Sequence, residues 1–396
     1  MAKCNVNTNE RFADIQMLRY ELKGFEDLSL NQKLYIFCLA KATLMGRDIT
    51  FDQQGKYNLR IRKTLETVYL HYEGDRECEE FKAFEVYLKR IWFASGIHHH
   101  YGCEKFKPGF SEEYFYHLME NIGEELLPIK RGETKEDLMR QLESILFDPE
   151  VMPKRVNQTD GEDLVLTSAC NFYEDVTQEE VERFYAKMKN TDNPNPPSYG
   201  LNSKLTKRNN EVVELTWKED GLYGETIREI VSWLLKAQKY AENEGQKHVI
   251  DLLVKFYRTG NLEDFDRYSI AWVEQHEGLV DFINGFIEVY GDPLGMKGTW
   301  EGIVEYKDLE ATKRTQTISQ NAQWFEDHSP VDPRFRKPEV KGVTANVICA
   351  AMLGGEEYPA SAIGINLPNS NWIRQEHGSK SVTIGNLTDA YNKAAQ

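Results

Sequence analysis

Residues 363–369 read Ile-Gly-Ile-Asn-Leu-Pro-Asn, and their apolar side chains alternate with small or polar ones. This period of two predicts a half-buried β-strand. Proline has no N–H to give to a neighbouring strand, so Pro368 places this strand at the edge of a sheet. An edge strand can accept an extended peptide as an additional strand, and Asn366 and Asn369 add amide groups that can hold a second backbone. An ordinary edge strand that runs into an Asn-rich turn is the alternative.

Four more segments show a strand pattern, and most of the remaining sequence is helical. The predicted strands are residues 282–290, 300–306, 343–352 and 382–386. Residues 9–147 have apolar side chains three and four apart, three helices are predicted between residues 224 and 275, and another covers residues 309–325. The sequence therefore predicts an α+β fold, with a helical front half, a five-stranded sheet in the last third and a helical insertion between its strands.

Composition and charge exclude several classes of protein. The 396 residues include 48 Lys and Arg against 64 Asp and Glu, a formal charge of -16 without a basic run, which argues against nucleic acid or an anionic membrane as a partner. No apolar stretch is long enough for a membrane span and no signal peptide opens the chain, so we expect a soluble cytoplasmic protein. The six cysteines form no Cys-x-x-Cys pair and are expected to be reduced. Cys4 leaves one alternative, a lipid anchor on an exported protein.

Two glutamates and a tyrosine are candidates for a binding site. In the predicted strand 282–290, Glu288 and Tyr290 share a face because strand side chains alternate. Glu301 follows on the next strand, after a glycine-rich turn that brings it near the same face. Two carboxylates and a phenol beside an edge strand suit the ammonium group of an extended peptide, which predicts a preference for free N-termini. In the alternative interpretation, both glutamates are exposed positions of an ordinary sheet.

The run His98-His99-His100 is a candidate of another kind, a metal site. Three consecutive side chains diverge on a helix and alternate on a strand, so they rarely form one preformed site. We expect a loop after the helix that ends near Ala94, and a metal-dependent enzyme built on these histidines is the alternative. The sequence has no His-Glu-x-x-His motif, no Walker loop, no Gly-x-Ser-x-Gly elbow and no dinucleotide-binding glycine pattern.

Several of these segments together resemble the dipeptidyl peptidase III family of zinc exopeptidases. The segments that carry the resemblance are Tyr101-Gly-Cys-Glu-Lys-Phe106, Phe286-Ile-Glu-Val-Tyr-Gly-Asp-Pro293, Trp300-Glu-Gly302, Gly364-Ile-Asn-Leu-Pro-Asn369, Ile373-Arg-Gln375 and Gly385-Asn386. The resemblance implies a two-lobed protein, in which a five-stranded β-core surrounded by helices forms the lower lobe and the upper lobe is mainly helical. Residues 1–307 and 340–396 would belong to the lower lobe, the latter with the substrate-binding edge strand, and residues 308–339 to the upper lobe.

The resemblance also implies roles in an enzyme that releases dipeptides from the N-termini of short peptides. Glu288, Asn366 and Asn369 would hold the ammonium group and first residues of the substrate, and Tyr290 would be the catalytic residue at the developing oxyanion. The adjoining subsites would be lined by Tyr101, Ile287, Glu301, Ile363, Gly364 and Ile365.

The zinc half of the family's site is absent from residues 1–396. The family's His-Glu-x-x-Gly-His motif and its second Glu-Glu-Cys-x-x-Glu motif would both follow the Gly385-Asn386 segment. The ligands of one zinc ion are therefore expected downstream of Gln396, and none within this chain. We expect a monomeric N-terminal part of such an enzyme that is inactive by itself. A non-catalytic peptide-binding protein is the alternative.

Overall fold

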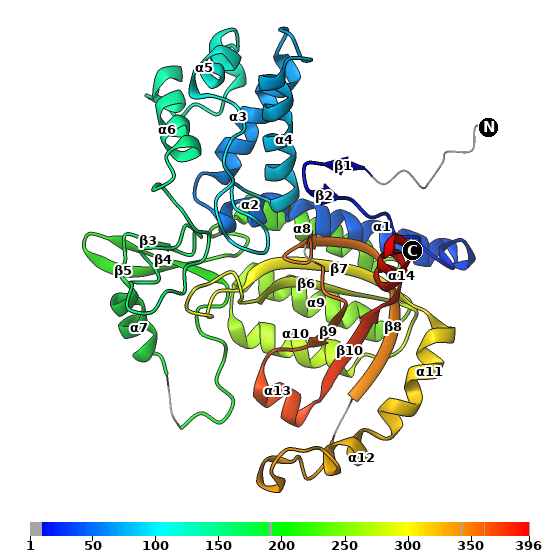
Figure 1. Ribbon diagram of the computed structural model, residues 1–396. Coiled ribbons are helices and arrows are strands. Elements are labelled where there is room, and N and C mark those ends of the chain that lie inside the picture. Colours follow the sequence, from blue (N-terminus) through cyan, green and yellow to red (C-terminus); the bar gives the residue numbers. More distant parts are fainter. Residues whose placement is uncertain (1–9, 190–191, 341–342, 360, 396) are drawn as a thin grey trace, which may run out of the picture.

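The computed structural model describes residues 10–189, 192–340, 343–359 and 361–395. Cys4, and with it the alternative of a lipid anchor, lies outside these residues. The described chain arranges its helices around a central sheet (Figure 1). This architecture confirms the predicted α+β class.

The central sheet has five strands in the order β6-β7-β8-β10-β9. Their bounds are β6 Val280–Glu288, β7 Thr299–Lys307, β8 Val343–Gly355, β9 Gly364–Leu367 and β10 Ser379–Ile384. Neighbouring strands are antiparallel except β8 and β10, which run parallel. All five predicted strands are present. β9 is an edge strand that ends directly before Pro368, as the missing N–H of proline predicts.

Long helices pack on this sheet and form the main hydrophobic core with it. They are α1 Leu30–Met45, α8 Gly224–Gln238, α9 Glu244–Thr259 and α10 Leu262–Glu274. In α9 the buried Val249, Leu253 and Phe256 recur three and four residues apart, which places them on one face of the helix. Ser29 and Gln32 form a capping box at the start of α1. In Figure 1, α9 and α10 lie behind the sheet and cover one of its faces.

A second hydrophobic core belongs to a helical subdomain at the top of Figure 1. Its helices are α2 Arg47–Gln54, α3 Asn58–His71, α4 Glu79–Ala94, α5 Glu112–Glu120 and α6 Lys135–Phe147. Aromatic rings hold them together, for example Phe84 and Phe110, whose ring centroids lie 5.7 Å apart in an edge-to-face contact. The helix predicted to end near Ala94 is confirmed as α4.

The other helices and strands are small or peripheral. They are β1 Arg11–Phe12, β2 Ile15–Gln16, β3 Tyr173–Glu174, β4 Ser203–Arg208, β5 Glu211–Thr216, α7 Gln178–Ala186, α11 Leu309–Gln320, α12 Ala322–Asp327, α13 Asn371–Glu376 and α14 Gly385–Ala395. β3, β4 and β5 form a second sheet. α11 and α12 leave the central sheet between β7 and β8 (Figure 1), so the predicted helical insertion is present.

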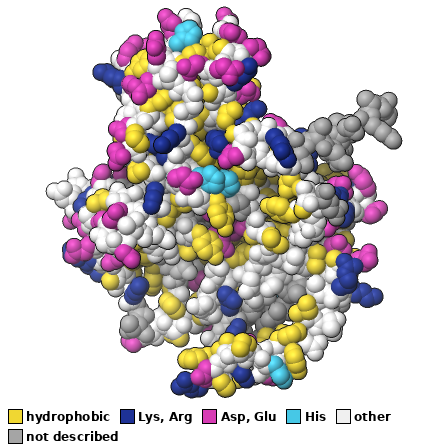
Figure 2. Space-filling view, in the orientation of Figure 1, with side chains coloured by type: hydrophobic (Ala, Val, Ile, Leu, Met, Phe, Trp, Pro, Cys, Tyr) yellow, Lys and Arg dark blue, Asp and Glu magenta, His cyan; other side chains and the backbone are white. Residues whose placement is uncertain are grey.

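The surface agrees with the acidic composition. On the face that Figure 2 presents, Lys and Arg side chains are scattered singly among Asp and Glu and gather into no basic patch. In the described part of the chain, no helix has the length and apolar character needed to cross a membrane.

Candidate functional site

The two edge strands of the central sheet end beside each other. Glu288 is the last residue of β6, and Asn369 follows the end of β9 by two residues. The Asn369 side chain hydrogen-bonds the Glu288 side chain. β6 and β9 are opposite edges of the sheet, and this contact joins the end of one to the residues that follow the other.

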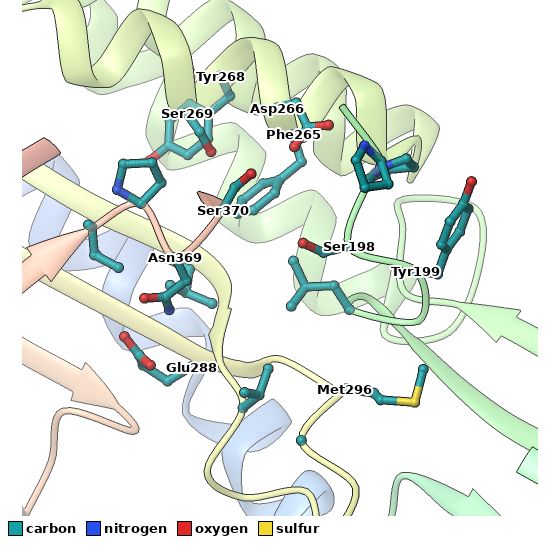
Figure 3. A pocket seen from close by; sticks show the side chains of 18 of the residues that line it. Ser198, Tyr199, Phe265, Asp266, Tyr268, Ser269, Glu288, Met296, Asn369 and Ser370 are labelled. Atoms are coloured by element: carbon teal, nitrogen blue, oxygen red, sulfur yellow. The ribbon is translucent and has the colours of Figure 1, made fainter. Parts of the chain in front are cut away.

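A cavity of about 960 Å³ opens where these edges meet (Figure 3). One wall consists of the end of β6, the turn after it and the residues after β9, and the other wall is one face of α10. The structure brings together four of the predicted site residues here, namely Ile287, Glu288, Tyr290 and Asn369. It adds lining residues that the sequence did not predict, among them Ser198, Tyr199, Phe265 and Asp266.

Glu288 supplies a carboxylate that lacks a cationic partner in this cavity. Burial raises its pKa, and the hydrogen bond with Asn369 lowers the pKa in part. None of the ion pairs found among the described residues involves Glu288. A positively charged group that entered the cavity would favour the ionised form of this side chain.

Tyr290 lies beyond the end of β6, so the prediction that the strand continues to residue 290 is wrong. The reason is Asp292, whose buried carboxylate accepts hydrogen bonds from the backbone N–H groups of Met296 and Lys297, each at 2.8 Å, and from the Tyr173 hydroxyl. These bonds fold residues 289–298 into a compact turn. Tyr290 still lines the cavity, with 78% of its surface exposed.

Glu301 is buried, with 1% of its surface exposed, and the interpretation as an exposed sheet position is wrong for this residue. It lies on β7 between two neighbouring strands, opposite Gly285 of β6 and Gly355 of β8. Burial raises its pKa well above the ordinary value, and the nearby carboxylates of Glu357 and Glu288 raise it further. Its Oε2 atom has no hydrogen-bond partner among the described residues. Glu301 is therefore held in its neutral form.

Glu356 and Glu357 are two further carboxylates near Glu301 that the sequence did not predict for the site. Gly355 has a φ of +70°, and a Cβ atom there would lie 2.1 Å from the carbonyl oxygen of Trp300. Only glycine fits this turn, which folds the two glutamates back toward β7. Burial raises the pKa of Glu357 to about 7, and its carboxylate neighbours add to the shift.

The edge strand itself has the alternation that the sequence predicts. Leu367 is buried, whereas Gly364 and Asn366 are exposed and Ile365 packs partly against the main core. Asn366 Oδ1 accepts a hydrogen bond from Ser381 Oγ at 3.1 Å, so its amide is held by β10. Ile363, directly before the strand, is 60% exposed. The outer edge of β9 has no neighbouring strand in the described part of the chain.

Tyr101 does not join the other predicted residues. It is 82% exposed and lines a second cavity of about 730 Å³, together with Tyr358 and Ser361 from the connection between β8 and β9. Tyr101 and Glu288 thus line two different cavities.

The three consecutive histidines stabilise their own loop. His98 is buried, its Nε2 lies 2.8 Å from the carbonyl oxygen of Met152, and burial lowers its pKa to about 4. His99 Nδ1 accepts a hydrogen bond from the backbone N–H of Gly102 at 3.0 Å, and its ring stacks on His100. No group of three or more His, Cys, Asp or Glu in the described ranges could hold a metal ion. The residues present therefore do not fit a zinc ion.

Comparisons with known proteins place this chain among the peptidases. Residues 149–396 match the model of Peptidase family M49, and the chain belongs to this family. Dipeptidyl peptidase 3 from Rattus norvegicus is 24% identical to it over 403 residues, which cover 92% of this chain and 53% of that protein. Dipeptidyl peptidase 3 from Homo sapiens is 23% identical over 397 residues, with the same coverage. The resemblance to the dipeptidyl peptidase III family is confirmed.

Solved structures show the same fold. The structure of DPP III from Caldithrix abyssi matches with a TM-score of 0.66 and 17% identity, over 93% of this chain and 57% of that chain. The structure of dipeptidyl-peptidase III from Corallococcus sp. strain EGB matches with a TM-score of 0.65, over 92% of this chain and 56% of that chain. The chain spans about half the length of the curated relatives it matches.

Proposed function

We propose that this chain is the peptide-binding part of a zinc-dependent dipeptidyl peptidase III, which releases dipeptides from the N-termini of short peptides. The observation that carries the proposal is the position of Glu288 and Asn369. They lie together in one cavity, at the end of an edge strand whose outer side has no neighbour in the described chain. Family membership supports the peptidase class.

In this proposal the peptide is bound through its backbone and its N-terminus. The backbone pairs with the free edge of β9, and the N-terminal ammonium group enters the cavity against Glu288. Charge-assisted hydrogen bonds contribute about 1.5–3 kcal/mol each, and the incoming cation offsets the cost of keeping Glu288 ionised in a partly buried position. Asn366 and Asn369 orient the first residues, and backbone pairing makes the site tolerant of peptide sequence.

The remaining predicted residues keep their proposed roles on this path. Tyr290 lines the cavity and is largely exposed, and its hydroxyl group could donate a hydrogen bond to the carbonyl oxygen at the scissile bond. The neighbouring subsites are assigned to Tyr101, Ile287, Glu301, Ile363, Gly364 and Ile365. Residues 1–307 and 340–396 are assigned to the lower lobe and residues 308–339 to the upper lobe.

In this proposal, residues other than those described here supply the ligands of the zinc ion. It would activate water and polarise the scissile carbonyl, but the described residues contain no group of ligands for it. This chain therefore binds and orients the peptide. A cytoplasmic location and a monomeric state are part of the same proposal.

Peptide binding with and without a free N-terminus tests the proposal. We expect Glu288→Ala to weaken binding of a free-amine pentapeptide by about ten- to a thousandfold, because one or two charge-assisted bonds are lost. The same peptide with an acetylated N-terminus should bind the variant and the wild type equally, as measured by isothermal titration calorimetry. Equal losses for both peptides would show that Glu288 does not bind the amine.

A non-catalytic peptide-binding protein is the second candidate. The absence of a metal-ligand group from the described residues favours it, since binding requires only the cavity and the edge of β9. The intact mass of the native gene product distinguishes the two candidates. A mass well above 46.0 kDa would support the peptidase, and a mass of 46.0 kDa would support the binding protein.

A further inference from the structure

The outer side of α1 carries three exposed apolar side chains, Leu30, Phe37 and Leu44, here named the α1 stripe. They lie seven residues apart and therefore share one side of the helix, and each exposes at least 41% of its surface. The opposite side of α1, which includes Tyr35 and Leu39, is buried against α8 and the central sheet. Single exposed apolar side chains are common, whereas apolar groups aligned at this spacing are the pattern by which one helix binds another.

An aromatic ring on the neighbouring helix widens the α1 stripe at its middle. Trp233 on α8 is half-buried, and its ring lies edge to face against Phe37, with 6.0 Å between the ring centroids. Aromatic side chains with one exposed side are enriched at the centres of protein interfaces, because their large apolar surface is ordered before binding. Phe37 and Trp233 thus form the middle of the surface, and Leu30 and Leu44 form its two ends.

Two lysines lie over these rings without a carboxylate partner. The Nζ atom of Lys41 is 5.6 Å from the centre of the Phe37 ring, and that of Lys236 is 3.8 Å from the centre of the Trp233 ring. Neither lysine forms an ion pair or a hydrogen bond among the described residues. α1 itself contains no acidic residue. In a chain with a formal charge of -16, this surface is therefore locally positive.

We propose that the α1 stripe and Trp233 form a docking surface for an acidic amphipathic helix of a partner protein. Apolar side chains that recur every seven residues on that helix contact the α1 stripe. Its Asp and Glu side chains pair with Lys41 and Lys236, so that the charges of the two surfaces are complementary. Because the rings already hold both ammonium groups, little conformational freedom is lost when the carboxylates bind.

The surroundings favour a helix over two other occupants. A two-fold contact with a second copy of this chain would bring the unpaired lysines of one copy against those of the other, which is repulsive. Beside the α1 stripe the charge is mixed, since Lys33 pairs with Glu26 at 3.3 Å and Glu229 is exposed on α8. The positive site is therefore narrow. A single helix covers only this site, whereas an anionic membrane would also meet the surrounding acids.

Two matched peptides of three heptads test this surface. The first carries leucine once per heptad with glutamate beside each leucine, and the second has lysine in place of every glutamate. Both are acetylated, which removes the ammonium group that Glu288 is proposed to bind. Fluorescence anisotropy of the labelled peptides should show that the full chain binds the glutamate peptide about tenfold more tightly than the lysine peptide.

Variants of the surface separate a direct contact from loss of structure. Lys41→Glu combined with Lys236→Glu should reverse the preference, so that the lysine peptide binds more tightly, a result that unfolding would not produce. Phe37→Ala should weaken binding of the glutamate peptide about tenfold or more, because a central aromatic side chain contributes much of the affinity of an interface. Lys63→Glu and Leu70→Ala, which change exposed residues of α3, are the controls and should retain both affinity and preference.

The remaining outcomes would overturn the proposal. An unchanged preference in the double variant would show that the two lysines do not bind the partner. If the glutamate peptide does not bind but vesicles that contain phosphatidylserine do, the surface is a membrane contact. A dimer in sedimentation velocity that Phe37→Ala dissociates would assign the surface to self-association. If this chain binds the glutamate peptide but the native gene product does not, the α1 stripe is covered within the native protein.

Discussion

Asn369 shows how one amide controls the charge of a neighbouring acid. Its hydrogen bond stabilises the ionised form of Glu288 and opposes the rise in pKa that burial causes. Only the ionised form can pair with an ammonium group. In the proposed function, Asn369 therefore acts both on the peptide and on the state of Glu288.

Replacement of Asn369 should weaken peptide binding in a pH-dependent way. Asn369→Leu removes the hydrogen bond, so the pKa of Glu288 rises and a larger fraction of this carboxyl is protonated at low pH. We expect the affinity for a free-amine peptide to fall about three- to tenfold at pH 8, and by more at pH 5.5, as measured by titration calorimetry. Asn371→Ala, which changes an exposed asparagine at the start of α13, is the control. A loss that is equal at both pH values would contradict the role of Asn369 in the charge of Glu288.

The connection between β6 and β7 is the element that gives the cavity its shape. At its end, Lys297 is fully buried, and its Nζ donates to Ser203 Oγ at 3.0 Å and to the Tyr185 hydroxyl. Ser203 begins β4, directly after the loop that contributes Ser198 to the cavity. Lys297 thus joins two chain segments that form one side of the cavity. Burial lowers the pKa of Lys297 to about 8.

Lys297→Met should change how stability depends on pH. The pKa of this lysine is about 8 in the folded chain and about 10.4 in the unfolded chain, so the unfolded state binds more protons between these values. The contribution of Lys297 to the free energy of unfolding therefore rises with pH, by about 1 kcal/mol between pH 7.5 and 9. Urea denaturation at both pH values should show that wild type gains this amount relative to Lys297→Met. A constant difference would show that Lys297 is not the group that titrates.

The helices and strands were predicted from the local sequence pattern, whereas features that depend on the register between strands were not. The five strands of the central sheet follow from alternation, and α1 and α4 from their helical spacing and capping. The sequence did not predict that Glu301 is buried next to Glu357, because this requires the pairing of Glu301 with Gly355 across two strands. The turn at Tyr290 was missed because the hydrogen bonds of Asp292 that form it reach beyond the local pattern.

At the scale of the whole molecule, the cavity exists only when distant segments come together. Its walls combine the loop before β4, one face of α10, the end of β6 and the residues after β9. The Asp266 side of the cavity could not be predicted, since the acids of α10 look alike in the sequence until their partners are known. The polar site residues on the strands could be predicted, because Pro368 places its strand at the edge of the sheet and so indicates where these side chains lie.

The carboxylates between β6, β7 and β8 should make the folded protein less stable as pH rises. Glu301 has a folded pKa well above its unfolded value near 4.3, so the unfolded chain loses this proton first. The contribution of Glu301 to the free energy of unfolding is therefore greatest at low pH. It falls as pH rises from the pKa of the unfolded chain toward that of the folded chain. Glu301→Gln keeps the shape of the side chain and removes its titration, so the difference between variant and wild type reports Glu301 alone.

We expect the Tm of Glu301→Gln, relative to wild type, to be higher at pH 8 than at pH 5 by at least about 2 °C. Scanning calorimetry at the two pH values measures this difference, with Glu277→Gln, an exposed glutamate, as the control that should show no change. A Tm difference that does not vary with pH would mean that Glu301 ionises in the folded protein. In that case the strain among Glu288, Glu301 and Glu357 would be relieved by another group. If the expected rise is found, the folded sheet keeps Glu301 protonated beside the proposed peptide site, and a cation bound nearby would make its ionised form less unfavourable.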